Sequence, residues 1–278
     1  MPRVSVVVPA YNSVRFIGAT IDSILAQSYR DFHLYISDHS STDGTWEELQ
    51  RYAGHAQVTL SRLPTGGGAP ANWNAVTAHA SSDLIKLVCG DDLVYPDCLA
   101  VQVAAFDSHP GTVMVASARD IIDAAGMPMI RGRGLAGMTG PIRGRDAVRR
   151  TILAGVNIFG EPGCVLFDRS TLLDVGGWDA RFPYLIDQAT YTRVLLRGDL
   201  VAIPEPQAGF RINDDQWSVA LAKSQSAQAK SFHRWVFETQ PGILGTLDLL
   251  RGNAMATAMA LARRAVSAWL RRSRSTTP

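Results

Sequence analysis

The chain has 278 residues, of which 46% are hydrophobic and 19% charged, so it can bury a sizeable core and is not a disordered protein. Its 27 Lys and Arg nearly balance its 25 Asp and Glu, which argues against a protein that coats nucleic acid. Three cysteines without a CxxC pair make a disulfide framework or a structural zinc site unexpected and agree with a reducing, cytoplasmic setting. No segment reaches about 18 uninterrupted apolar residues, so no membrane span is expected.

The first 108 residues alternate strand-like and helix-like stretches. Residues 4–8 form a β-branched run that is typical of a buried parallel strand, and further strands are expected at 32–37, 58–60 and 84–88. Helices are expected after Ser13, at 45–52, at 70–79 and from Pro96 onward. Four such units predict an α/β fold with a doubly wound, mostly parallel sheet.

The later pattern is more mixed. We expect strands at 113–118 and 164–167, a mobile loop at 126–145, a helix at 190–196 and helices beyond residue 218 with a break near Pro241. This predicts an α/β domain at residues 1–215 and a helical extension at 216–278.

The extension carries an apolar stripe at helical spacing, formed by Met255, Met259, Ala262, Val266 and Trp269. From Arg251 onward it holds six arginines and no acid. Such a helix packs on the domain or on a partner, or lies on an anionic membrane as a basic amphipathic helix. Packing is the favoured interpretation.

Ligands of doubly wound sheets bind beyond the carboxyl ends of the strands, which draws attention to the loops there. In PAYN (residues 9–12), Tyr11 either stacks on a planar base or is a partly buried turn residue. In ISDHSSTDGT (residues 36–45), the Asp38 carboxylate can accept from a base N–H or a ribose hydroxyl. Thr42 or Asp43 can cap the next helix.

Two adjacent carboxylates follow the fourth strand, in LVCGDDLVYP (residues 87–96). Asp91 and Asp92 repel each other unless a cation lies nearby, and a divalent ion that bridges a diphosphate would remove the repulsion. The alternative is that Asp92 caps the next helix while Asp91 faces solvent. The glycines at 66–68 are not a phosphate-binding P-loop, because no GK[ST] follows them.

Together these motifs resemble the family 2 glycosyltransferases over residues 3–215, which implies the nucleotide-diphospho-sugar-binding GT-A fold. Asp38 matches the first acid of the second-strand motif, and His39 replaces the second. In the aspartate motif Cys89 replaces the first acid. The resemblance implies that Asp91 contacts a divalent cation, Mg²⁺ or Mn²⁺. The residues implied to bind the nucleotide sugar are Pro9, Tyr11, Asn12, Asp38, Asn74, Gly90, Asp91, Asp92 and Arg211.

Two later segments are similar to the family's acceptor half: GEPGCVLFDR (160–169) and VGGWDARFPYLIDQATYTRVL (175–195). They imply acceptor-side roles for Glu161, Trp178 and Asp179. The resemblance implies that Asp187 is the general base, although Ile186 replaces the usual preceding Glu. The alternative for Asp187 is an N-cap of the helix at 188–197. Arg211 either meets a phosphate or closes the site, or is an ordinary surface residue.

The sequence thus predicts an inverting glycosyltransferase that moves a sugar, with UDP as the expected carrier, to a hydroxyl of a glycan or lipid-linked acceptor. Nucleic acid is not an expected partner. The expected location is cytoplasmic, with peripheral contact at the inner face of the membrane left open by the basic helix. A catalytically inactive nucleotide-sugar-binding protein is the alternative that Cys89 and Ile186 support. A sugar-1-phosphate nucleotidyltransferase is disfavoured because no triphosphate loop follows the first strand. The sugar and the oligomeric state are not determined.

Overall fold

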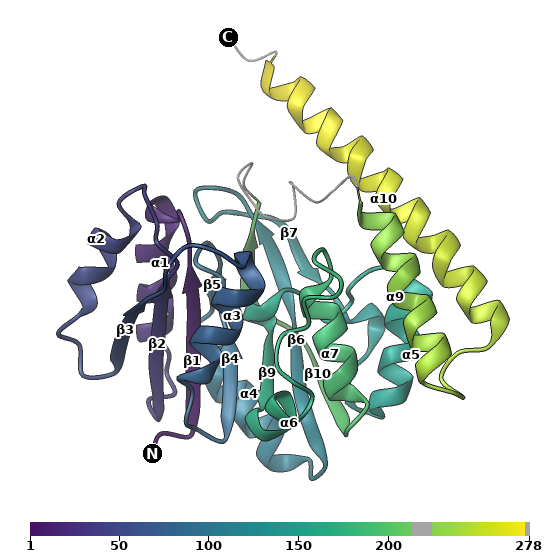
Figure 1. Cartoon of the computed structure of the whole chain (residues 1–278), viewed down its shortest axis with the longest axis horizontal. Helices are drawn as coiled ribbons and strands as arrows, with labels where there is room; N and C mark the ends of the chain where they lie inside the picture. Colours follow the sequence, from purple (N-terminus) through teal and green to yellow (C-terminus); the bar gives the residue numbers. More distant parts are fainter. Residues whose placement is uncertain (213–223, 276–278) are drawn as a thin grey trace.

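A single mixed sheet runs through the centre of the protein in the computed structural model, which describes residues 1–212 and 224–275, with side chains through Arg263 (Figure 1). The strand order is β3-β2-β1-β4-β9-β6-β10-β5, with β7 paired to β6 and β8 paired to β10. Helices cover both faces, and the second half of α10 projects away from the rest of the molecule.

The amino-terminal half consists of β1 (Val4–Ala10), α1 (Val14–Leu25), β2 (Phe32–Asp38), α2 (Thr45–Leu49), a 3₁₀ turn (Gln50–Tyr52), β3 (Val58–Arg62), α3 (Gly68–Ala78), β4 (Leu84–Leu87), β5 (Leu93–Val94) and α4 (Cys98–Ser108). β1 pairs in parallel with β2 and β4, and β2 with β3. The predicted parallel α/β arrangement is confirmed. The helix expected from Pro96 starts at Cys98, after Asp97.

The second half consists of β6 (Thr112–Ile122), β7 (Pro128–Arg133), a 3₁₀ turn (Leu135–Gly137), β8 (Gly140–Ile142), α5 (Gly144–Ala154), a 3₁₀ turn (Pro162–Cys164), β9 (Val165–Asp168), α6 (Arg169–Asp174), α7 (Ile186–Leu195), β10 (Asp199–Arg211), α9 (Gln225–Thr239) and α10 (Thr246–Ser275). β9 lies antiparallel between β4 and β6. The mobile loop expected at 126–145 is wrong, because this segment supplies β7 and β8 to the sheet.

Burial on both faces explains the apolar run of the first strand. All seven residues of β1 are buried. Val4, Val6 and Val8 belong to one hydrophobic core and Val7 to the core on the other side of the sheet. On the first of these sides, Ile17, Ile21 and the other buried apolar residues of α1 cover the sheet. Because β1, β2, β3 and β4 run parallel, the loops after them lie at one edge of the sheet.

The first half of α10 packs on α5 and α9 through small residues. A Cβ on Gly252 would lie 2.7 Å from the carbonyl oxygen of Ile152, so the helices touch through their backbones. Gly252, Ala256 and Ala260 are buried, whereas Met255 is exposed. The packed face is therefore not the predicted methionine stripe.

Two predictions about the extension lie wholly or partly outside the described residues. These are the domain boundary at residue 215 and the side chains of Val266 and Trp269. No described helix is long and apolar enough to cross a membrane.

Candidate active site

The carboxyl end of β2 holds a buried acceptor that the described protein leaves unpaired. Asp38 Oδ2 accepts from the backbone N–H of Ser41 at 3.2 Å and pairs with Arg62 Nε at 3.0 Å. Asp38 Oδ1 is buried and has no hydrogen-bond partner in the structure. A buried carboxylate oxygen without a partner is unusual and fits a ligand N–H or hydroxyl.

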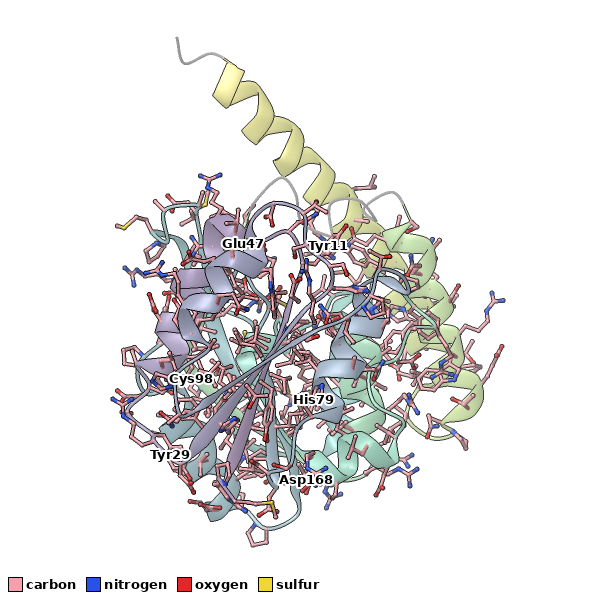
Figure 2. All side chains as sticks on the ribbon, turned by 60° about the vertical axis from the view of Figure 1, so that its left-hand side comes forward. Tyr11, Tyr29, Glu47, His79, Cys98 and Asp168 are labelled. Carbon is pink, nitrogen blue, oxygen red and sulfur yellow. The ribbon has the colours of Figure 1, made fainter. Side chains whose placement is uncertain are left out.

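An exposed aromatic ring stands at the end of the neighbouring strand β1. Tyr11 is 61% exposed, and its ring centroid lies 6.1 Å from that of the buried His39. Figure 2 shows Tyr11 at the same edge of the molecule as Glu47, with Tyr29 and Asp168 at the opposite edge. An exposed ring beside an unpaired carboxylate oxygen is suited to binding a planar base.

Hydrogen bonds between two loops hold this region in shape. Asn12 has a positive φ of 45°, its backbone N–H donates to Ser41 Oγ and its side-chain carbonyl accepts from the Thr42 N–H. Asp43 accepts from the backbone N–H groups of Val14 and Thr45. Asn12 therefore joins the two loops, and Asp43 accepts an N–H group at the start of each neighbouring helix. The N-cap position of α2 is Gly44 rather than Thr42 or Asp43. Pro9 is buried next to the last residue of β1, opposite Ser37 of β2.

The Asp91–Asp92 pair follows β4 and is fixed from two sides. A Cβ on Gly90 would lie 3.1 Å from both Ile17 Cδ1 and Ser13 Oγ, so this glycine lets the loop lie on α1. Asp92 is 2% exposed and accepts from the Arg211 N–H at 3.0 Å. Burial and the neighbouring Asp91 charge raise the pKa of Asp92 well above its usual range. Asp92 is not the cap of α4, because Asp97 precedes that helix.

Arg211 is buried rather than at the surface. Its Nε donates to the Asp91 carbonyl at 2.7 Å, and its Nη1 donates to the carbonyls of Asp123 and Ala124, each at 2.9 Å. Its guanidinium carbon lies 4.7 Å from the centroid of the Phe16 ring. Arg211 thus positions the aspartate loop.

The residues near Asp91 suit a cation that takes most of its ligands from a bound diphosphate. No group of three potential His, Cys, Asp or Glu ligands occurs in the described part of the chain. Burial, followed by the charges of Asp92 and Asp91, raises the pKa of the Cys89 thiol well above its ordinary value, which disfavours the thiolate ligand. Mg²⁺ is commonly held by one or two carboxylates together with substrate phosphates, so Asp91 alone fits this kind of site.

A second carboxylate cluster lies at the start of α7. Asp187 occupies the first turn after Leu185, and its Oδ1 accepts from the Gln188 N–H at 2.7 Å. Its Oδ2 accepts from the amide of Asn157 at 2.8 Å. Asp187 is therefore not the N-cap, although it accepts one of the free N–H groups of the helix start.

The surroundings of Asp187 give it the properties of a base near neutral pH. Burial, reinforced by the charge of Glu161, raises the pKa of Asp187 to about 6, against the opposing hydrogen bonds and the Arg119 charge. Glu161 forms an ion pair with the buried Arg119, whose Nη2 also donates to Glu161 Oε1 at 3.1 Å. The charges of Asp91, Asp92, Asp187 and Glu161 all raise the pKa of Cys89, so both carboxylate clusters lie near this residue.

Trp178 and Asp179 lie inside the fold rather than on an open acceptor surface. Trp178 is 2% exposed, and its indole N–H donates to Thr77 Oγ1 at 2.9 Å. Asp179 forms an ion pair with Arg181 at 2.6 Å. Burial alone would raise the pKa of Asp179, but the hydrogen bonds from Arg181 outweigh it and lower the pKa. Both residues anchor the segment that leads into α7.

Asn74 supports the same segment, and the neighbouring Asn72 faces the site. The side chain of Asn74 donates to the Trp178 carbonyl at 3.1 Å and accepts from its N–H at 2.9 Å. Asn72 donates to the Ala10 carbonyl at 3.1 Å, and its own buried side-chain oxygen has no partner in the structure. Residues two positions apart lie on nearly opposite sides of a helix, so only one asparagine of ANWN can face the end of β1.

Arg119, Asn157 and Asn72 were missed by the sequence analysis. The resemblance pointed to Asn74, whereas the helix phase places Asn72, two residues earlier, at the end of β1. Arg119 and Asn157 belong to no motif, and only the pairing of β6 with β9 and the approach of α7 bring them to Asp187.

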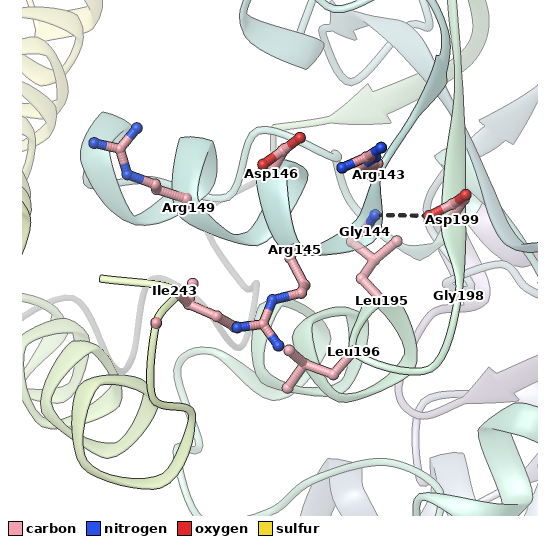
Figure 3. A pocket seen from close by; sticks show the side chains of 11 residues that line it. Arg143, Gly144, Arg145, Asp146, Arg149, Leu195, Leu196, Gly198, Asp199 and Ile243 are labelled. Atoms are coloured by element: carbon pink, nitrogen blue, oxygen red, sulfur yellow. Dashed lines mark hydrogen bonds between the residues drawn. The ribbon is translucent and has the colours of Figure 1, made fainter. Parts of the chain in front are cut away.

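A separate hollow of 460 Å³ lies near the amino-terminal ends of α5 and β10, away from the aspartates (Figure 3). The Gly144 N–H there donates to Asp199 at 3.1 Å. Arg149 pairs with Asp248 at 2.8 Å. Asp199 and Arg149 in the hollow thus already have protein partners. None of the residues that line the hollow belongs to the two carboxylate clusters.

The family model for glycosyl transferase family 2 matches residues 5–174, more than half of the chain. The chain belongs to this family. It is 35% identical over 128 residues to the putative glycosyltransferase EpsE of Bacillus subtilis (strain 168), covering 45% of this chain and 46% of that protein. It is 28% identical over 118 residues to the poly(ribitol-phosphate) beta-N-acetylglucosaminyltransferase TarS of Staphylococcus aureus, covering 41% of this chain and 21% of TarS. The matched regions span less than half of these curated relatives.

Solved structures confirm the expected GT-A fold. The crystal structure of S. aureus TarS 1–349 in complex with UDP-GlcNAc has a TM-score of 0.70 at 17% identity, covering 92% of this chain and 71% of that chain. The mannosyltransferase PcManGT from Pyrobaculum calidifontis in complex with GDP-Man and Mn²⁺ has a TM-score of 0.64 at 20% identity, covering 97% and 80%.

Proposed function

We propose that the protein is an inverting glycosyltransferase that moves a sugar from a nucleoside diphosphate to an acceptor hydroxyl. The observation that carries the proposal is that the carboxylates of Asp187, Glu161, Asp91 and Asp92 all lie close enough to Cys89 to raise its pKa. This arrangement brings a candidate base and a candidate cation ligand to one region of a family 2 fold.

In the proposed reaction the acceptor oxygen attacks the anomeric carbon while the bond from that carbon to the diphosphate oxygen breaks. Asp187 takes the proton of the acceptor hydroxyl. With a pKa of about 6, this carboxylate is mostly ionised at neutral pH and is still basic enough to accept the proton. A single base opposite the leaving group fits one displacement and hence inversion.

The chain's other groups bind and orient the donor. Asp38 accepts a hydrogen bond from the nucleotide base through its unpaired oxygen, and the exposed ring of Tyr11 stacks on the same base. Asp91 would hold a divalent cation, which when bound neutralises charge on the departing diphosphate. Arg211 acts on the Asp91 loop rather than on the phosphate.

The donor and acceptor classes follow less directly. UDP is the proposed carrier, supported by the UDP-GlcNAc in the TarS structure, whereas PcManGT was solved with GDP-Man. We propose a glycan or lipid-linked hydroxyl as acceptor, on the pattern of TarS, whose name gives poly(ribitol-phosphate) as its acceptor. The three free cysteines support the proposal of a cytoplasmic location.

The test is product formation with a panel of UDP- and GDP-sugars, with and without Mn²⁺ or Mg²⁺. Asp187→Asn is expected to lower kcat by at least about a hundredfold, whereas the matched variant Asp174→Asn, at an exposed position of α6, is expected to keep it. Full turnover by Asp187→Asn would show that Asp187 is not the general base. Tight donor binding by the native protein without transfer or donor hydrolysis would favour the inactive sugar-nucleotide-binding protein that Cys89 and Ile186 suggest.

A further inference from the structure

Large apolar side chains are exposed on the hairpin formed by β6 and β7. Met127 is 64% exposed, Met129 52% and Ile130 48%. They lie in the turn after β6 and in β7, which pairs with β6 and is exposed over nearly its whole length. Met129 and Ile130 are consecutive strand residues that point to opposite faces of β7, so both faces of the hairpin end expose apolar side chains, which indicates an interaction surface.

Arg211 connects this hairpin to the rim of the candidate active site. Its Nη1 donates to Asp123 and Ala124 in the hairpin turn, and its guanidinium lies over the Phe16 ring at the start of α1. Arg15 lies over the same Phe16 ring. We call Arg15, Met127, Met129, Ile130, Arg131 and Arg133 the hairpin surface.

The charge on the hairpin surface is positive. Arg15, Arg131 and Arg133 are exposed, and the side chain of Arg131 is 78% exposed although it lies 3.8 Å from Asp120. Asp120 is buried and accepts from Tyr95 Oη at 2.9 Å and from the Gly132 N–H at 2.9 Å.

The other acid of the hairpin is also turned toward the backbone. Asp123 Oδ1 accepts from the N–H groups of Ala125 and Met127 inside the turn, at 2.8 and 2.9 Å. The exposed side chains of the hairpin are therefore apolar or cationic.

We propose that the hairpin surface docks on an anionic lipid surface. Apolar side chains at the tip would enter the boundary between headgroups and acyl chains, and the arginines would bind lipid phosphates. A second copy of the chain would instead offer the same arginines and no exposed acid of the hairpin to pair with them. The surface lies beside the aspartate loop, so docking directs the site toward the membrane. Lipid binding is measurable without turnover and does not depend on the proposed reaction.

The test is co-sedimentation of the full chain with phosphatidylcholine vesicles that contain or lack phosphatidylglycerol. The native protein is expected to bind the anionic vesicles and to be released by salt. The triple variant Met127→Ser/Met129→Ser/Ile130→Ser is expected to bind at least about tenfold more weakly with unchanged thermal stability, because these side chains are already exposed. The control Leu247→Ser/Leu250→Ser, at side chains 81% and 60% exposed near the start of α10, is expected to bind like the native protein.

Three outcomes would overturn the proposal. The first is absence of binding to anionic vesicles. The second is that the triple variant binds as well as the native protein, which would assign lipid binding to another element such as α10. A control variant that binds as weakly as the triple variant would have the same meaning. The third is a dimer in light scattering that the triple variant dissociates, which would identify a second copy as the occupant.

Discussion

Replacement of Asn157 by leucine should move the acid limb of the pH–rate profile to higher pH. The amide of Asn157 donates to Asp187 Oδ2 at 2.8 Å, and this hydrogen bond favours the ionised carboxylate. A hydrogen bond to a charged group contributes about 1.5–3 kcal/mol. Since one pKa unit corresponds to about 1.4 kcal/mol, the pKa of Asp187 should rise by about 1–2 units.

The consequence for rate follows from the starting value. The pKa of Asp187 is about 6 in the native protein. A rise to about 7–8 would leave roughly a half to a tenth of the base ionised at pH 7, so kcat/KM there should fall about two- to tenfold. At pH 9 most of the loss should be recovered, because the carboxylate is then ionised in both proteins.

The assay is kcat/KM for the best donor of the panel, measured between about pH 5 and 9. The control is Asn74→Leu, which removes a half-buried asparagine that is hydrogen-bonded to the Trp178 backbone and not to Asp187. Asn74→Leu should lower the free energy of unfolding and leave the acid limb of the pH–rate profile at its native pH. An Asn157→Leu limb that coincides with the native one, or that moves to lower pH, refutes the reasoning.

Three further outcomes are expected. Because the folded-state pKa of Asp187 is raised from 3.8 to about 6, ionisation destabilises the native state as pH rises through that range; Asp187→Asn should therefore raise the free energy of unfolding by roughly 1–3 kcal/mol above pH 7 and by little below pH 4, as measured by urea denaturation. Asp38→Asn should weaken UDP binding about tenfold in calorimetry, because it alters the unpaired carboxylate oxygen. An unchanged Kd would show that the nucleotide base binds elsewhere. Gly177→Ala should destabilise the fold by about 2 kcal/mol or more, because φ is 71° and a Cβ would lie 2.5 Å from a side-chain oxygen of α3; a stability equal to that of the native chain would contradict this geometry.

Local pattern was sufficient for the amino-terminal half of the fold. β1 and β4 are short runs buried at every residue, so their sequences are mostly apolar and are recognised without knowledge of their partners. The loops after such strands meet at one edge of the sheet, which is why Asp38 and Asp91 could be assigned to one site before the structure was described.

Strands with little buried area could not be predicted in this way. Nearly every residue of β7 is exposed, so its sequence carries no alternation, and the glycines and arginines around it suggested a loop. Its hydrogen bonds to β6 depend on residues that precede it in the chain, and no local pattern encodes them.

Short-range periodicity and turn chemistry specify the α/β class, the order of the motifs and the carboxylates at the strand ends. Which polar groups meet follows from the packing of the chain: Asn72 rather than Asn74 lies at the end of β1, Asn157 binds Asp187, and Arg211 holds the Asp91 loop. Packing also decides that Gly252 and Ala256, not the methionine stripe, form the packed face of α10. The physical reason is that these contacts join residues far apart in the chain, so that burial and hydrogen-bond partners follow from packing rather than from spacing.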